Sequence, residues 1–259
     1  MKQIEIIFTI LFFTVLTSCS NHKLEEKGFP VNATTQSKEA EKIEGISKDS
    51  LKFDTRPSNV LLTGISNVRL TTIYKVNQNK KDGTTFIGSN NYLYNETELS
   101  IGNNWNKNLI PGLEGAYGYN LVNISHYDIQ NNKQKNLFEK PVLIKTLYYP
   151  SFSKDTLNYK PIKRNYFLIS VYNDDTNKDG FINQKDLRRF YLYDSNGEKQ
   201  KQLVPEIYSV FKSEYDSDND FMFVFARLDV NKNGQIEDNE PINIFWIDLN
   251  DPTRTGQQY

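Results

Sequence analysis

The chain of 259 residues is poor in the residue types that build several common kinds of site. Its only cysteine is Cys19, so no disulfide can form within one molecule. It has two histidines, His22 in a polar N-terminal region and His126 further on, so a Ser–His–Asp triad would have to use His126. The formal net charge is −1, which gives no strong field to attract nucleic acid, and we expect no nucleic-acid partner.

Motifs of the common enzyme classes are also absent. The chain has no G-x-S-x-G elbow, no H-E-x-x-H, no P-loop and no G-x-G-x-x-G after a predicted strand. A glycosidase uses two carboxylates whose spacing has no sequence signature, so a hydrolase with a carboxylate site stays open as an alternative. We expect a protein that is not an enzyme, with His126 packed in or on a strand.

The N-terminus predicts a cell-envelope address. Residues 6–16 form an apolar run of signal-peptide length, too short for a comfortable membrane span. The run leads into Leu16-Thr17-Ser18-Cys19, which resembles the lipobox of bacterial lipoproteins. The resemblance implies that the signal peptide is residues 1–18 and that Cys19 carries a lipid anchor. The implied membrane is the outer membrane, on its periplasmic or surface side.

The region that follows is predicted to be a tether. Residues 19–58 contain almost no aromatics and many Lys, Glu, Ser and Thr residues. Such a segment cannot bury enough apolar surface to offset the entropy lost on ordering. We expect residues 19–58 to be flexible and residues 59–259 to form one domain, since about 200 residues suffice for a sizeable core.

The predicted domain is all-β and antiparallel. No long stretch keeps a 3.6-residue apolar period, and the aromatics lie in short runs between clusters of Asn, Asp, Gly and Lys. The candidate strands are Val68–Val76, Thr84–Ile87, Tyr92–Tyr94, Gly118–Asp128, Val142–Tyr149, Tyr166–Tyr172, Arg189–Asp194, Ile207–Ser213, Phe221–Arg227 and Ile242–Asp248.

Two twelve-residue loops, 175–186 and 229–240, fit the D-x-[DN]-x-[DN]-G-x5-[ED] pattern of an EF-hand calcium loop. Calcium takes six to eight oxygen ligands, which such a loop supplies from positions 1, 3, 5, 7, 9 and 12. The expected cofactor is Ca²⁺. The expected ligands of the first loop are Asp175, Asn177, Asp179, the carbonyl of Phe181, Asn183 and Asp186, and those of the second are Asp229, Asn231, Asn233, the carbonyl of Gln235, Glu237 and Glu240.

Details of the two loops support this interpretation. Gly180 and Gly234 stand at position 6, where the chain turns sharply through a conformation that glycine adopts cheaply. Glu240 at position 12 can chelate with both oxygens, whereas Asp186 is one methylene shorter. The alternative is that both runs are ordinary Asp/Asn/Gly turns. The flanking segments have the pattern of strands rather than helices, which argues against a calmodulin-like switch.

The loops belong to a longer internal repeat. Asp175 and Asp229 are 229 − 175 = 54 residues apart, and at this offset Phe167–Asp175 matches Phe221–Asp229. A weaker echo at Tyr119–Phe138 lacks the loop, and a fourth unit would run from Asn67 to Trp105. Sheet repeats of this length resemble the blades of a closed or incomplete β-propeller, with a β-sandwich as the alternative.

Three further features of the sequence bear on function. Asp216-Ser-Asp218-Asn-Asp220 looks like half a calcium loop, but a solvated turn is favoured. Trp105 lies in a polar loop and suggests a glycan site, whereas Trp246 is expected in the core. The prediction is a membrane-anchored calcium-binding structural or binding module, with glycan or peptide recognition as an alternative.

Overall fold

The computed structural model describes residues 28–30, 53–79, 82–88 and 110–259. Its regular secondary structure within these ranges is entirely β, and every strand pairing is antiparallel, which confirms the predicted fold class. Over the same ranges we find no helix with the length and apolar character needed to cross a membrane. Cys19, Trp105 and the candidate strand Tyr92–Tyr94 lie outside the described residues.

Three antiparallel sheets make up most of the structure, and each visits its strands in chain order. The first sheet consists of β2 (Thr55–Leu62), β3 (Val68–Gln78), β6 (Leu121–Asp128) and β7 (Lys133–Asn136), with β4 (Thr85–Ile87) on β3. The middle sheet consists of β5 (Leu113–Ala116), β8 (Leu143–Pro150), β11 (Tyr166–Tyr172), β13 (Arg189–Asp194) and β14 (Lys199–Gln202). The third sheet consists of β15 (Tyr208–Asp216), β16 (Phe221–Leu228), β17 (Ile242–Asp248) and β18 (Thr255–Gln257).

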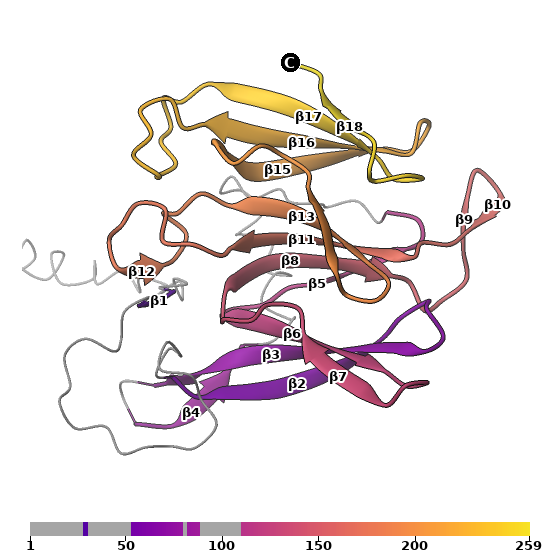
Figure 1. Ribbon diagram of the computed structural model, residues 1–259, viewed down its shortest axis with the longest axis horizontal. Helices are drawn as coiled ribbons and strands as arrows, with labels where there is room; N and C mark the ends of the chain where they lie inside the picture. Colours follow the sequence, from indigo (N-terminus) through magenta and orange to yellow (C-terminus); the bar gives the residue numbers. More distant parts are fainter. Residues whose placement is uncertain (1–27, 31–52, 80–81, 89–109) are drawn as a thin grey trace, which may run out of the picture.

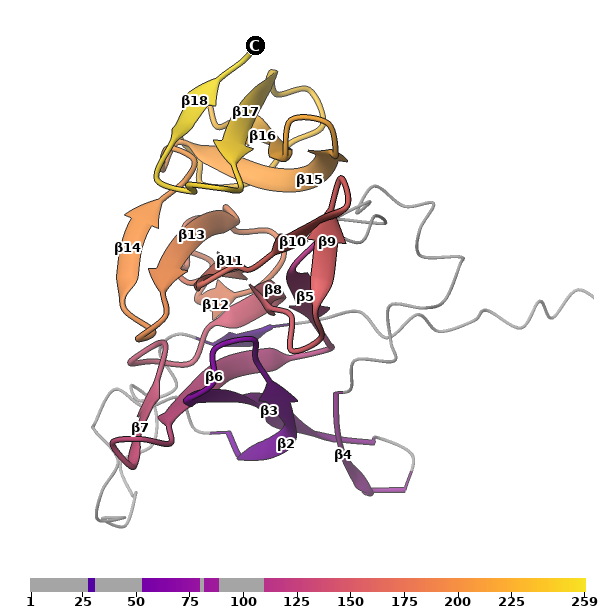
Figure 2. The ribbon, with the colours of Figure 1, turned by 90° about the vertical axis from the view of Figure 1, so that its right-hand side faces the viewer.

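The three sheets stack face to face in the order first, middle, third (Figures 1 and 2). All seven residues of β11 are buried because both faces of the middle sheet are covered. Phe167, Ile169 and Val171 join the core shared with the first sheet. Tyr166 and Leu168, one residue out of phase, join the core shared with the third sheet. This alternation is the two-residue period of a strand between two apolar layers.

Several predicted strands have the predicted bounds, including β11, β13 and β17. The fourth unit proposed from Asn67 is wrong, because β3 lies in the same sheet as β6 and β7 of the weaker echo. Three stacked sheets also exceed the two layers of a simple sandwich. The prediction missed short polar strands, namely β9 (Asp155–Leu157), β10 (Lys160–Ile162), β14 and β18.

The predicted repeat of 54 residues is one residue too short for the strands that precede the loops. Met222, Val224 and Ala226 of β16 face the middle sheet, as Phe167, Ile169 and Val171 of β11 face the first sheet. The offset here is 222 − 167 = 55, whereas the loops and the following strands keep 54. Three residues separate Val171 from Asp175 but only two separate Ala226 from Asp229. A shift of one residue exchanges the two faces of a strand.

Part of the predicted tether packs against the domain. β1 (Phe29–Pro30) pairs with β12 (Phe181–Ile182), a short strand inside the first twelve-residue loop. The Phe29 side chain is fully buried, 5.2 Å from the ring of Phe53. The first sheet begins at Thr55 rather than at residue 59. The predicted boundary therefore lies inside β2, and the described part of residues 19–58 is ordered against the sheets.

We expect Phe29→Ala to lower the free energy of unfolding by less than about 3 kcal/mol. A buried Phe→Ala change typically costs about 3–5 kcal/mol, but a two-residue strand can detach locally without unfolding the sheets. The matched control is Phe152→Ala, because Phe152 is 57% exposed. Thermal unfolding gives the global loss, and amide exchange at Ile182 gives the local one. Equal exchange rates in the two variants would show that β1 does not hold β12.

Candidate metal centre

The two twelve-residue loops occupy the same position in two sheets. The first joins β11 to β13 within the meander β8-β11-β13-β14, and the second joins β16 to β17 within the meander β15-β16-β17-β18. Each loop therefore links the second and third of four consecutive strands. Both loops project from the same side of the stack (Figure 1). In the first sheet the corresponding connection, between β3 and β6, is the longer stretch 79–120.

The first loop is coiled around its acidic and amide side chains. Asp175 accepts hydrogen bonds from the backbone N–H groups of Asp179 (3.0 Å) and Gly180 (2.9 Å). Asn177 Oδ1 accepts a second bond from the N–H of Asp179 (3.0 Å). Asp179 in turn accepts from the N–H of Phe181 (2.9 Å). Gly180 has φ +86°, which confirms the left-handed turn predicted at position 6.

The second loop repeats this geometry bond for bond. Asp229 accepts from the N–H groups of Asn233 (3.1 Å) and Gly234 (2.9 Å), and Asn231 Oδ1 also accepts from Asn233 (3.0 Å). Asn233 Oδ1 accepts from the N–H of Gln235 (2.8 Å), and Gly234 has φ +71°. Equal spacing of Asp, Asn and Gly therefore produces the same local coil in both loops, as side-chain-to-backbone bonding dictates.

Position 9 brings further predicted ligands together. Glu237 accepts hydrogen bonds from the amides of Asn233 (2.7 Å) and Asn231 (3.4 Å), so positions 3, 5 and 9 of the second loop converge. In the first loop, Asp179 Oδ2 accepts from the amide of Asn177 (3.2 Å) and is 3.5 Å from that of Asn183. The gathered groups mix acids with amides. Within the described ranges no set of three or more His, Cys, Asp or Glu side chains is placed to hold a metal ion by itself.

Position 12 is buried in both loops. Asp186 is fully buried, and its carboxylate accepts from the N–H groups of Asn183 (2.8 Å) and Thr176 (2.8 Å). Burial raises the pKa of Asp186 above its ordinary value, and these backbone donors act in the opposite direction.

The surroundings of Glu240 indicate whether the second loop suits a bound cation. Glu240 is 8% exposed, and its Oε2 accepts from the N–H of Glu237 (3.0 Å). Its Oε1 is buried and has no hydrogen-bond partner among the described residues. A buried carboxylate oxygen without a partner is costly, and a cation bound in the loop would compensate it. The donor set of carboxylate, amide and backbone oxygens is the set that Ca²⁺ prefers.

The two loops touch each other, which the sequence did not predict. Thr176 Oγ1 donates to the carbonyl of Gly234 (2.6 Å), and Asp186 forms an antiparallel bridge with Gln235. A Cβ built on Gly234 would lie 2.0 Å from the carbonyl oxygen of Thr176. Position 12 of the first loop and position 7 of the second are thus backbone neighbours. The loops form one paired centre, which we call the loop pair (residues 175–186 and 229–240).

The half-loop candidate at residues 216–220 is a hairpin turn, as predicted. Asp216 accepts from the N–H groups of Asp218 (3.0 Å) and Asn219 (3.3 Å) and from the Asn219 amide (2.7 Å). The bond from the Asn219 side chain holds the pKa of Asp216 below its ordinary value. Asp220, however, is not solvated: it is 3% exposed and turns inward to Arg164.

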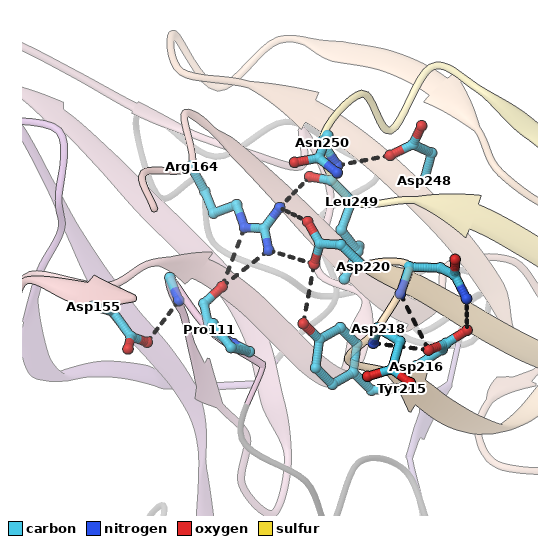
Figure 3. Close-up of polar contacts among 12 residues, drawn as sticks. Pro111, Asp155, Arg164, Tyr215, Asp216, Asp218, Asp220, Asp248, Leu249 and Asn250 are labelled. Atoms are coloured by element: carbon cyan, nitrogen blue, oxygen red, sulfur yellow. Dashed lines mark hydrogen bonds and ion pairs between the residues drawn. The ribbon is translucent and has the colours of Figure 1, made fainter. Parts of the chain in front are cut away.

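The Arg164–Asp220 pair ties the middle sheet to the third (Figure 3). Arg164, which precedes β11, donates to both Asp220 oxygens at 2.8 and 2.9 Å. It also donates to the carbonyl oxygens of Leu249, which follows β17, and Pro111, which precedes β5. The Tyr215 hydroxyl donates to Asp220 as well (3.1 Å). Because the carboxylate and guanidinium groups are satisfied by each other and by backbone, this cluster is a structural tie.

The structure also shows the positions of His126 and Trp246. His126 is buried, with Nε2 3.0 Å from the carbonyl oxygen of Ser195 and its ring edge on Phe167, so the packed role is confirmed. Trp246 is not in the core: it lies on the outer face of the third sheet, stacked on Phe221. The prediction for Trp246 was wrong because the strand alternates and places Phe245 inward.

Comparison with known proteins adds no family assignment. No protein-family model matches the chain, and no curated protein matches it at the level taken as significant.

Proposed function

We propose that this protein is a calcium-stabilised extracytoplasmic lipoprotein, a structural or binding module held at the membrane through Cys19. The observation that carries the calcium assignment is the loop pair. Its two loops have the same internal hydrogen bonds, and each buries an acid at position 12. One carboxylate oxygen of Glu240 is buried without a hydrogen-bond partner among the described residues. The lipid anchor rests on the lipobox-like residues 16–19. Incorporation of labelled palmitate into the full chain, and its loss in Cys19→Ala, tests the anchor.

Calcium in this proposal is a clamp within and between sheets. An ion in each loop would fix the connections between β11 and β13 and between β16 and β17. The contact between the loops would join the middle sheet to the third sheet. We further propose that the three sheets are blade-like units of an open, propeller-like stack. Extracellular calcium modules bind with Kd of about 10⁻⁴–10⁻³ M, so at about 1 mM calcium each site adds about 0.4–1.4 kcal/mol. This magnitude suits stabilisation rather than a sharp switch.

Thermal unfolding of the detergent-solubilised full chain tests the clamp. We expect the melting temperature to rise by several degrees when excess EGTA is replaced by about 2 mM calcium, since two sites with the Kd range above together add about 1.3–3.6 kcal/mol at that concentration. Asp175→Ala combined with Asp229→Ala removes position 1 of both loops and should abolish the shift. Magnesium at the same concentration is the ion control. A full calcium shift in the double variant would contradict the assignment of the loops.

A further inference from the structure

The outer face of the third sheet carries a continuous set of large apolar side chains. β16 alternates along its length: Met222, Val224 and Ala226 point to the middle sheet, so the residues between them point away from it. The third sheet forms one end of the stack in both views (Figures 1 and 2). We call this surface the aromatic face; it consists of Phe211, Phe221, Phe223, Phe225, Ile244 and Trp246, all half-buried.

Neighbouring strands build the aromatic face in register. Phe223 pairs with Trp246 and Phe225 pairs with Ile244 across β16 and β17. Phe221 stacks on Trp246 at 5.4 Å with an interplanar angle of 12°, and Phe211 meets Phe225 edge-on at 6.4 Å. Trp246 lies flat over β18, where a Cβ on Gly256 would be 2.7 Å from the indole. These ring contacts hold the side chains in place, so the surface is preorganised.

The equivalent surface of the middle sheet is an interface with another sheet. There Tyr166, Leu168, Phe190 and Leu192 are buried against the third sheet. With the 55-residue offset for β16 and the 54-residue offset for β17, these four correspond to Phe221, Phe223, Ile244 and Trp246. The aromatic face thus has the side chains of a sheet-to-sheet interface. Among the described residues no further sheet covers it.

The other end of the stack is a poorer partner than a second aromatic face. On the first sheet the outward positions of β3 and β6 include Arg69, Thr71, Ser125 and Tyr127. Leu70, between the first two, and His126, between the last two, are buried toward the middle sheet. Stacking head to tail would take the charged Arg69 guanidinium out of water against Phe223 and Trp246, and the burial of a charge is costly. Among the described residues, the same aromatic face on another copy is the surface that matches it in large apolar side chains, and such self-matching is the requirement of a two-fold interface.

The chemistry of the aromatic face favours protein over sugar. None of its six side chains carries a hydroxyl or carboxamide group to bond a glycan. The bordering charges are already engaged: Lys212 pairs with Glu214 and lies 4.6 Å from the Phe225 ring centroid, and Arg227 pairs with Asp238. Mixed charges at the border and a net charge of −1 leave no strong repulsion between two copies.

We propose that the aromatic face docks on the aromatic face of a second copy of this chain, so that two three-sheet stacks form one six-sheet assembly. The interface is apolar at Phe223 and Trp246 and charged at its border. This proposal uses no residue of the loop pair, so it stands or falls separately from the calcium assignment.

Photocrosslinking of the full chain in its membrane tests the proposal. The photoreactive aromatic benzoylphenylalanine replaces Phe223 in one strain and Ile129, which is 46% exposed in the turn between β6 and β7, in another. Two differently tagged copies are expressed together, so that an adduct between copies carries both tags. We expect a doubly tagged band of twice the chain mass from position 223 and none from position 129.

The result that overturns the proposal is equally visible. Absence of a doubly tagged band from position 223, or a band that joins Phe223 to another protein or to carbohydrate, removes the second copy as occupant. A second measurement uses Phe223→Glu, which should lower the doubly tagged fraction recovered by one tag at least about tenfold, as expected for a central interface residue. Ile129→Glu, the matched control, should leave that fraction unchanged.

Discussion

Arg164→Ala is expected to lower the free energy of unfolding by about 3–5 kcal/mol, the largest effect we expect from a single substitution in this chain. Removing Arg164 leaves Asp220 as a buried carboxylate without its counter-ion, and breaking a buried pair typically costs this much. It also removes the donor of the Pro111 carbonyl oxygen and one of the two donors of the Leu249 carbonyl oxygen, which keeps the Tyr166 hydroxyl. For about 200 residues the melting temperature should fall by roughly 6–20 °C.

The comparison that isolates burial is Lys135→Ala. Lys135 forms an ion pair with Glu198 in which both side chains are exposed, at 39% and 66%, so its loss should cost less than about 1 kcal/mol. Arg164→Met combined with Asp220→Leu should recover much of the stability, because an apolar pair leaves no buried charge. Equal losses for Arg164→Ala and Lys135→Ala in calorimetry would show that the Arg164 tie does not hold the two sheets together.

Gly234→Ala is expected to cost about 2–5 kcal/mol and to weaken the first loop as well as its own. The left-handed backbone of a non-glycine residue costs about 1–2 kcal/mol, and overpacking adds about 1–3 kcal/mol. The overpacking arises because the new Cβ would meet the backbone oxygen of Thr176 at 2.0 Å, in the other loop. A calcium titration followed by calorimetry should show weaker binding at both sites.

Gly180→Ala is the matched substitution at position 6 of the first loop. Gly180 also has positive φ, but a Cβ there meets no atom within 4 Å. Only the backbone strain of about 1–2 kcal/mol remains, and the second loop should bind calcium normally. If Gly180→Ala and Gly234→Ala are equally destabilising, the contact between the loops carries no free energy.

The sequence predicted the strands that are dense in apolar residues. β11, β13 and β17 are dense apolar runs that end at turn residues, so their bounds could be read directly. β2 was missed because its first six residues are all exposed, so its sequence shows no alternation of apolar and polar side chains. Such a strand forms because its backbone pairs with β3, and backbone pairing leaves little trace in side-chain pattern.

The loops and the aromatic face show a second limit. Within each loop the coil follows from local spacing, so the sharp turn at the glycine of position 6 could be predicted. The contact of Thr176 with Gly234 joins residues 58 apart and has no local signal. The aromatic face was hidden by the extra residue between Val171 and Asp175, which shifts the repeat from 54 to 55 and exchanges the inner and outer positions of β16.

If Cys19 carries the proposed lipid, the pairing of β1 with β12 limits how far the loop pair can lie from the membrane. A tether that ended at residue 59 would give 40 residues from Cys19, a reach of about 140 Å at full extension. With Phe29 fixed on the first loop, only 29 − 19 = 10 residues separate it from Cys19, a reach of at most about 36 Å. With a lipid on Cys19, the loop pair stays next to the bilayer, at most about one membrane thickness from its surface.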